Sequence, residues 1–231
     1  MWYKNILQYI VDSIFPRHCI NCEVEGFILC DKCYKTLDVS GVFCCPVCHI
    51  PTEYGMCCSD RCRTEVSISK HCAISPYIED ALIGSLVHQF KYAYIEDIRI
   101  VFDKMIKDFC SYYDFDADLI VAVPLHRRRF VERGYNQASH IAYFLSRHTG
   151  IVYSDILKRT IYTQQQAKLS RQERQDNVRG AFELKQDVDI ADKRIIVVDD
   201  VYTTGSTIEA CADVLCRAGA HVVSGFSIAR G

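Results

Sequence analysis

The chain has 231 residues, of which 49% are hydrophobic, which is enough for one domain with a core of ordinary size and an appendage. Its formal net charge is −2 and its pI is about 6.4. These values exclude a histone-like protein that binds polyanions with its whole surface, so any anion site must come from local clusters of basic residues.

The N-terminal stretch MWYKNILQYIVDSIFP carries apolar residues at helical spacing, interrupted by Gln8 and Asp12. This stripe predicts a short helix that packs on the domain behind it, with a helix lying on a membrane surface as the alternative. The stretch is too short and too polar to span a membrane, and it lacks the unbroken apolar run of a signal peptide. We therefore expect a cytoplasmic protein, which partners can bring to the inner face of the membrane.

Cysteine is the most unusual part of the composition, because the chain has 14 and eleven of them lie between Cys19 and Cys72. A reducing cytosol keeps thiols free, so metal ligation is favoured over disulfides. The stretch CINCEVEGFILCDKC contains two C-x2-C knuckles, whose four thiolates can converge on one tetrahedral Zn²⁺. This spacing predicts a first zinc site formed by Cys19, Cys22, Cys30 and Cys33.

A second set of cysteines, CCPVCHIPTEYGMCCSDRC, contains one more C-x2-C knuckle, and its remaining ligands are ambiguous. The preferred ligands of a second zinc are Cys45, Cys48, Cys58 and Cys62. Cys57 and His49 are the substitutes, and pairing of knuckles between the two sets stays open, so one or two zinc ions are expected. Cys44 and Cys72 are interpreted as spectators, and Cys110, Cys211 and Cys216 as small hydrophobic residues of the domain that follows.

Regular structure begins where the knuckles end. A strand near residues 70–77 is followed by a helix with apolar residues at helical spacing from Leu82 to Phe90. The segments that follow are a strand at 118–124, a helix at 136–150, a strand at 194–200, a helix at 206–220 and a strand at 221–230. This alternation predicts an α/β domain with a parallel sheet at residues 67–231, behind a small zinc-binding domain with an N-terminal helix at residues 1–66.

The stretch IIVVDDVYTTGST joins the strand at 194–200 to the next helix. Its adjacent carboxylates, Asp199 and Asp200, repel each other and lower β propensity, so a partner that is cationic or rich in hydroxyls is expected beside them. Ligands bind beyond the carboxyl ends of strands in such sheets, and a helix N-terminus offers N–H groups to an anion. The loop hydroxyls and Gly205 fit a phosphate cradle, which lacks the lysine of a Walker loop. The alternative places Asp200 in a simple turn and makes Thr207 a helix cap.

Two basic segments flank this motif. AVPLHRRRFVERGYNQ places four arginines just beyond the strand at 118–124, where a diphosphate in the same crevice would need cations; a solvated basic loop is the alternative. Gly134 fits a tight turn there, and Tyr135 either stacks or simply packs. The polar stretch TQQQAKLSRQERQDN is expected to be a loop that closes over substrate, or an exposed helix at 170–177.

The motif VVDDVYTTGST resembles the 5-phosphoribosyl-1-diphosphate (PRPP) motif of type I phosphoribosyltransferases, with Tyr202 where an aliphatic residue is more usual. The resemblance implies that Asp199 and Asp200 bind the ribose hydroxyls and, in an active enzyme, are catalytic. It further implies Mg²⁺ bound with PRPP. The loop Thr203 to Thr207 would hold the 5-phosphate. The residues assigned to PRPP or phosphate binding as a whole are Val201, Tyr202, Thr203, Thr204, Gly205, Ser206 and Thr207. His88 and Lys91 are candidates for the hood that selects the acceptor, with core and surface roles as the alternative.

Together with the knuckles and LVHQFKY, the two basic segments are similar to the ComF family, late-competence proteins of bacterial DNA uptake, over nearly the whole chain. This resemblance implies a protein of natural transformation that binds single-stranded DNA and PRPP with Mg²⁺. The arginines that it assigns to diphosphate or DNA are Arg127, Arg128, Arg129, Arg133, Arg171 and Arg174. The alternative is an active phosphoribosyltransferase with an unknown nitrogen acceptor. A third interpretation, a zinc-stabilised module that recruits a competence helicase or a DNA-uptake channel, is compatible with both.

Overall fold

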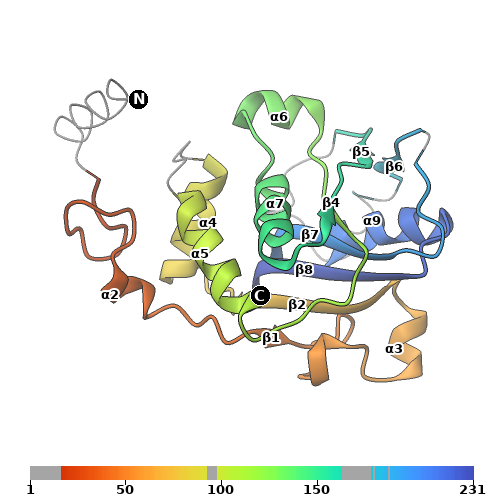
Figure 1. The fold of residues 1–231 in the computed structure, drawn as a ribbon, viewed down its shortest axis with the longest axis horizontal. Helices are drawn as coiled ribbons and strands as arrows, with labels where there is room; N and C mark the ends of the chain where they lie inside the picture. The colour runs from red at the N-terminus through yellow and green to blue at the C-terminus, as the bar shows by residue number, and fades with distance from the viewer. Residues whose placement is uncertain (1–16, 93–97, 163–177, 179, 187) are drawn as a thin grey trace.

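The computed structural model describes residues 17–92, 98–162, 178, 180–186 and 188–231 (Figure 1). The predicted N-terminal helix and the predicted closing loop at 163–177, with Arg171 and Arg174, lie outside these residues. Within the described ranges, no helix combines the length and the apolar character that a membrane span requires.

A six-stranded sheet forms the centre of the fold, in the order β1-β2-β8-β7-β3-β4. Its parallel strands are β2 (Ile68–Pro76), β8 (Val222–Arg230), β7 (Arg194–Tyr202), β3 (Leu119–Ala122) and β4 (Val152–Tyr153). The short strand β1 (Val42–Phe43) pairs antiparallel with β2. A separate antiparallel pair is formed by β5 (Leu157–Arg159) and β6 (Phe182–Leu184). The parallel sheet predicted from the alternation of strands and helices is confirmed.

Helices cover both faces of this sheet. The crossover helices α7 (Gln137–Thr149) and α9 (Ser206–Arg217) connect β3 to β4 and β7 to β8. The two connections advance in opposite directions along the sheet, and crossovers between parallel strands are almost always right-handed, so the helices lie on opposite faces, as Figure 1 shows. The order in which the chain adds strands to the sheet reverses between β7 and β3. At such a point, α/β sheets bind ligands beyond the carboxyl ends of their strands.

The other helices extend these layers. On the side of α7 lie α4 (Leu82–Tyr92) and α5 (Ile98–Cys110), and α6 (Arg127–Arg133) follows β3. The cysteine-rich region contains α2 (Asp31–Tyr34), the 3-10 helix η1 (Glu53–Gly55) and α3 (Asp60–Thr64). Gly150 ends α7 in the left-handed conformation, with φ 76°, as its position in the sequence predicted. Gly134, expected at a tight turn, ends α6, a helix not predicted from the sequence, with φ 75°.

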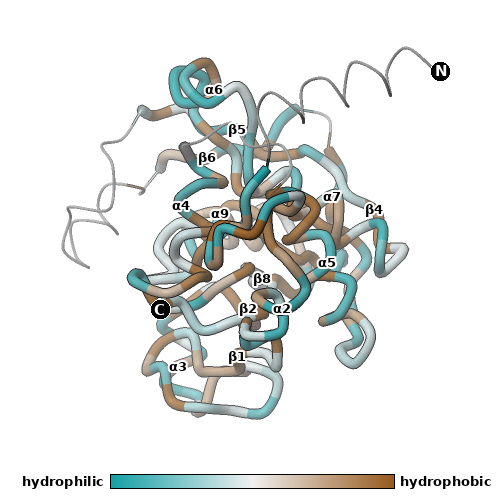
Figure 2. The backbone as a smooth tube through the Cα atoms, turned by 90° about the vertical axis from the view of Figure 1, so that its left-hand side faces the viewer, coloured by the Kyte–Doolittle hydropathy of each residue, from teal (hydrophilic) through white to brown (hydrophobic). Residues whose placement is uncertain are grey.

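The core lies between the sheet and the helices and extends into the cysteine-rich region. Figure 2 shows apolar residues gathered around β8 at the centre of the molecule. Phe43 of β1 stacks on Tyr113 and on Phe109 of α5, with ring centroids 5.4 Å and 6.2 Å apart. The predicted boundary between residues 66 and 67 therefore divides two segments that share one sheet and one core.

Cys72, expected to be a spectator, is buried in the core. Of the cysteines expected to act as small hydrophobic residues, Cys211 does so, since it is buried as well. The expectation is wrong for Cys216, which is exposed, and Cys110 is half-buried. The buried face of α9 runs through Ile208, Cys211 and Leu215. Each helical residue turns by about 100°, so position 216 points away from that face.

Candidate functional site

The predicted phosphate cradle is a tight turn between β7 and α9. Gly205 precedes the first residue of α9 with φ 75° and ψ −2°, a left-handed conformation that glycine adopts without strain. The hydroxyl oxygens of Thr204 and Ser206 lie 2.7 Å apart, and the Ser206 N–H donates to Thr204 Oγ1 at 3.4 Å. The turn thus brings hydroxyls and the N-terminal N–H groups of α9 to one place, which is the arrangement that binds phosphate.

A pocket of about 340 Å³ opens beside this turn. Its lining includes Asp199, Asp200 and all seven residues assigned to PRPP or phosphate binding, from 201 to 207. The other lining residues are Tyr77, Glu79, Lys91 and Ile208. The structure therefore brings the carboxylate pair and the cradle, which the sequence placed next to each other, onto one concave surface.

Burial and mutual repulsion govern the charge of the carboxylate pair. Burial, together with the charge of Asp200, raises the pKa of Asp199 to about 7. The Asp200 N–H donates to Asp199 Oδ1 at 2.9 Å, and the Lys91 ammonium lies 3.0 Å from Asp200 Oδ1. Although burial lowers the pKa of Lys91, the carboxylates of Asp200 and Asp199 raise it above its ordinary value. The pocket thus holds a lysine cation against its acidic pair.

Lys91 is held in place by the segment that follows α6. The carbonyl of Phe90, the residue before Lys91, accepts hydrogen bonds from the Tyr135 hydroxyl and, at 3.3 Å, from Gln137 Nε2. Asn136 Nδ2 donates to the Val123 carbonyl at 3.0 Å, which joins the same segment to the end of β3. Tyr135 therefore packs and anchors α4, which is the second of the two roles expected for it.

Sequence reasoning found these pocket residues only in part. Lys91 was one of two hood candidates, and the other, His88, is exposed and is absent from the pocket lining described here. Tyr77 and Glu79 were missed, because no local pattern marks them. They reach the pocket through the pairing of β2 with β8, which continues in the hydrogen bond from the Tyr77 N–H to the Arg230 carbonyl at 2.7 Å.

The arginines after β3 form a separate feature. Arg127, Arg128, Arg129 and Arg133 all belong to α6, a helix without buried residues. The guanidinium groups of Arg128 and Arg129 lie over the ring of Tyr162, at 5.3 Å and 5.7 Å from its centroid. Among the described residues that line the pocket, none belongs to α6. The structure therefore places this basic helix beyond the carboxyl end of β3, as expected, but beside the carboxylate pocket rather than in its lining.

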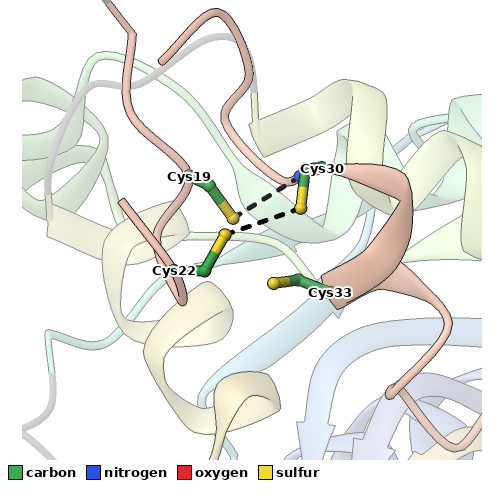
Figure 3. Close-up of side chains that lie close together, drawn as sticks. All are labelled: Cys19, Cys22, Cys30 and Cys33. Atoms are coloured by element: carbon green, nitrogen blue, oxygen red, sulfur yellow. Dashed lines mark hydrogen bonds between the residues drawn. The ribbon is translucent and has the colours of Figure 1, made fainter. Parts of the chain in front are cut away.

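The first set of cysteines converges in space (Figure 3). The Sγ atoms of Cys19, Cys22, Cys30 and Cys33 all lie within 4.8 Å of one another, and those of Cys22 and Cys30 are 3.6 Å apart. The Cys30 N–H donates to Cys19 Sγ at 3.5 Å, and Asn21 Nδ2 donates to Cys33 Sγ at 3.2 Å. Four thiolates around a tetrahedral Zn²⁺, each about 2.3 Å from the metal, are separated by about 3.8 Å, so this donor set fits zinc.

The second set forms a similar cluster from Cys45, Cys48, Cys58 and Cys62, again with Sγ atoms within 4.8 Å of one another. Cys58 Sγ lies 3.3 Å from Cys48 Sγ and 3.5 Å from Cys62 Sγ. The two substitute ligands are engaged elsewhere. Cys57 Sγ lies 3.8 Å from the Ile68 carbonyl, and His49 Nδ1 lies 3.3 Å from Arg230 Nη2. The four sulfur atoms of each cluster thus come from one set of cysteines, and the knuckles do not pair between sets.

Backbone geometry favours the thiolate form at one cysteine of each cluster. Burial raises the pKa of Cys19 and of Cys45, but backbone N–H groups directed at their sulfur atoms outweigh it and lower each pKa to about 6. The donors are the N–H groups of residues 21, 22 and 30 for Cys19, and of residues 47, 48 and 58 for Cys45. Such donors favour the thiolate form, which is the form that binds zinc.

Comparison with known proteins identifies the family of this chain. A family model described as the phosphoribosyl transferase domain matches residues 132–230. Competence protein F of Haemophilus influenzae is 30% identical, covering 94% of this chain and 99% of its own length. Competence protein ComFC of Streptococcus pneumoniae is 30% identical over 87% of each chain. The DNA utilization protein YhgH of Escherichia coli is 27% identical, covering 87% of this chain and 90% of its own length. The chain therefore belongs to the ComF family of competence proteins and carries a phosphoribosyltransferase-like α/β domain.

Proposed function

We propose that this protein binds PRPP with Mg²⁺ in the pocket at the end of β7, binds single-stranded DNA along α6, and handles incoming DNA in natural transformation. The observation that carries the proposal is the shared pocket. Asp199, Asp200 and the turn at 203–207 line one surface at the carboxyl end of β7, the strand next to the point where the strand order of the sheet reverses.

The pocket matches the chemical parts of PRPP. The turn and the first N–H groups of α9 suit the 5-phosphate, because they combine hydroxyl donors, close backbone approach and the positive end of a helix. The carboxylates of Asp199 and Asp200 are acceptors for two neighbouring ribose hydroxyls. Mg²⁺ bound with the ligand supplies charge neutralisation for the diphosphate and keeps several of its waters.

The helix α6 matches a polyanion better than a single diphosphate. Its four arginines are accompanied by only one acidic residue, Glu132, and Phe130 and Val131 are 49% and 74% exposed. Tyr162, at 41% exposure, lies under two of the guanidinium groups. Single-strand binding sites combine cations that follow the phosphates with exposed aromatic rings on which bases stack.

Calorimetry tests PRPP binding directly. Wild-type protein should bind PRPP in the presence of Mg²⁺, and Asp199→Asn with Asp200→Asn should abolish the binding heat. The control is Asp116→Asn with Asp118→Asn, which removes two carboxylates that pair with Arg194 at the other end of β7 and should leave PRPP affinity unchanged. An absence of binding heat from the wild-type protein at every Mg²⁺ concentration would exclude this part of the proposal.

Salt dependence tests DNA binding. The affinity for single-stranded DNA should fall steeply as the salt concentration rises. Arg127→Ala, Arg128→Ala and Arg129→Ala together should remove about two to three phosphate contacts. Each lost contact should make the plot of log affinity against log salt concentration shallower by about 0.7. A variant with the same net charge, Arg147→Ala with Lys185→Ala and Arg217→Ala, removes cations from other surfaces and should keep the slope. Equal slopes for the two triple variants would mean that α6 is not the binding surface.

The two binding sites should be separable. Because Asp199→Asn with Asp200→Asn removes negative charge near α6, it should leave DNA affinity unchanged or improve it while PRPP binding is lost. In a transformable host, the arginine variant should lose transformation more completely than the aspartate variant. Loss of both binding activities in a folded aspartate variant would instead show one coupled activity.

An active phosphoribosyltransferase is the second candidate, and the observation that favours it is the complete pocket with Lys91 beside the acidic pair. Transfer would release diphosphate from PRPP and join C1 of the ribose to a nitrogen nucleophile. The test is diphosphate release from PRPP with a panel of nitrogen compounds. Release that requires Asp199 and Asp200 would establish transfer, whereas binding without release would leave PRPP as a ligand.

A further inference from the structure

The second cysteine cluster touches the α/β domain through three successive backbone carbonyls. Arg230 donates from Nη1 to the Cys44 carbonyl and from Nη2 to the Cys45 carbonyl, both at 2.8 Å. The Tyr202 hydroxyl donates to the Pro46 carbonyl at 3.1 Å. Cys45 is a member of the second cluster, so these hydrogen bonds join its knuckle to the ends of β8 and β7.

The side chains that make these contacts are buried in one network. Arg230 and Tyr202 are only 5% and 2% exposed, and the Arg230 guanidinium lies 4.7 Å from the centroid of the Tyr202 ring. His71 is fully buried and contacts both side chains. Its ring centroid lies 3.8 Å from that of Tyr202, and its Nδ1 accepts a hydrogen bond from Arg230 Nη1 at 3.4 Å. A buried polar group without a hydrogen-bond partner destabilises the fold. The hydrogen bonds to the knuckle carbonyls therefore hold the side chains of Arg230 and Tyr202 in position.

Tyr202 in turn shapes the phosphate turn. A Cβ atom added to Gly205 would lie 2.2 Å from the Tyr202 hydroxyl oxygen and 2.4 Å from Cζ, so the end of the tyrosine ring rests directly on the backbone of Gly205. Gly205 is the residue with φ 75° from which α9 starts. The position of the tyrosine ring therefore decides where the turn and the first N–H groups of α9 can lie.

We propose that the second cysteine cluster is a positioning device for the phosphate turn, acting through Tyr202 and Arg230. A metal held by Cys45, Cys48, Cys58 and Cys62 would keep the knuckle rigid and its carbonyls aimed at the two side chains. The Tyr202 hydroxyl then holds the ring against Gly205. The first cluster packs instead with Leu29 and Leu82 and contributes no carbonyl to this set of three. The functional meaning of the device rests on the proposed phosphate-binding role of the turn.

Amide hydrogen exchange of the full-length, zinc-loaded protein tests this coupling without any ligand. In Tyr202→Phe, which removes only the hydroxyl, the peptide covering residues 202–211 should exchange roughly fivefold faster than in wild type, the effect of one lost hydrogen bond of ordinary strength. Cys58→Ser should speed the same peptide at least as much. The matched controls are Tyr34→Phe, which removes a buried hydroxyl bonded to Asp108 Oδ2 at 2.6 Å beside the first cluster, and Cys33→Ser. Both controls should leave this peptide at its wild-type rate.

The double variant tests the path. If the metal acts through the hydroxyl, Tyr202→Phe should add little to the exchange already caused by Cys58→Ser. Wild-type exchange of residues 202–211 in Tyr202→Phe, or in a Cys58→Ser protein shown by elemental analysis to have lost one zinc, would overturn the proposal, as would equal acceleration by Cys33→Ser. PRPP calorimetry on the same proteins is a separate measurement. Failure of wild type to bind PRPP would remove the proposed function and leave the exchange result standing.

Discussion

Asp199 and Lys91 set the charge of the pocket at neutral pH. Asp199 has its pKa raised to about 7 by burial and by Asp200, and Lys91 opposes that rise. A carboxyl with a raised pKa is protonated in the folded state over a pH range in which the unfolded chain has lost its proton. The pocket therefore changes charge near physiological pH.

This titration predicts a loss of stability as pH rises. Between the ordinary value of 3.8 and about 7, the folded protein binds the Asp199 proton more tightly than the unfolded chain, so the free energy of unfolding falls with increasing pH, by at most about 1.4 kcal/mol per pH unit. Above pH 7 this contribution is gone. Urea denaturation from pH 5 to pH 8 should show a shallower decline for Asp199→Asn than for wild type. Identical declines would mean that Asp199 titrates in its ordinary range.

Lys91 supplies the check on this assignment. Because its ammonium lowers the pKa of Asp199, Lys91→Met should move the midpoint of the Asp199 titration to higher pH. Lys185→Met, which breaks an exposed ion pair with Asp155, should leave that midpoint unchanged. Carboxyl NMR chemical shifts measure both.

At the scale of elements, two helix ends use glycine in the same conformation but in different surroundings. Gly150 ends α7 with φ 76° and has no other atom within 4 Å of an added Cβ, whereas Gly205 starts α9 with φ 75° against the Tyr202 ring. The two positions thus separate the cost of left-handed backbone from the cost of steric overlap.

We expect Gly150→Ala to lower the free energy of unfolding by about 1 kcal/mol, the price of a left-handed non-glycine residue. Gly205→Ala should lower it by about 1–3 kcal/mol more, because its methyl group would overlap Tyr202. Chemical denaturation of both variants measures the difference, and calorimetry should show a loss of PRPP binding for Gly205→Ala alone. Equal destabilisation would mean that the Tyr202 ring moves aside freely.

At the scale of the whole molecule, the two cysteine clusters differ in how they join the rest of the fold. The first forms a small cluster of its own with Leu29 and Leu82. The second lies beside β1, which extends the central sheet, and its knuckle is bonded to the ends of β7 and β8. A metal at the second cluster should therefore stabilise the α/β domain, and a metal at the first should act more locally.

Elemental analysis should find two zinc ions per chain in wild type, about one in Cys33→Ser and in Cys58→Ser, and two in Cys57→Ser, whose thiol lies outside both clusters. Cys58→Ser should lower the melting temperature of the α/β domain more than Cys33→Ser does. A zinc count that falls in Cys57→Ser but not in Cys58→Ser would reassign the fourth ligand of the second site.

Local signals in the sequence determined much of this protein. The alternation of apolar runs and helical stripes predicts the parallel sheet, and C-x2-C spacing predicts all three knuckles. The VVDDVYTTGST motif likewise predicts an acidic pair and a phosphate turn at one strand end, because each of these features depends on residues a few positions apart. Such predictions need only local information, because the faces of strands and helices follow short residue periods and a knuckle spans only four residues.

Tertiary structure decided what depends on distant segments. Cys57 and Cys58 are neighbours in sequence, and packing against β2 turns one toward Ile68 and leaves the other in the cluster. Lys91 reaches Asp200 because α4 is anchored by the segment after α6. The hydroxyl of Tyr202 meets a carbonyl 156 positions away, and Arg230 meets one 185 positions away. Such contacts form only when the sheet places β7 and β8 beside the knuckle, and no local periodicity encodes that placement.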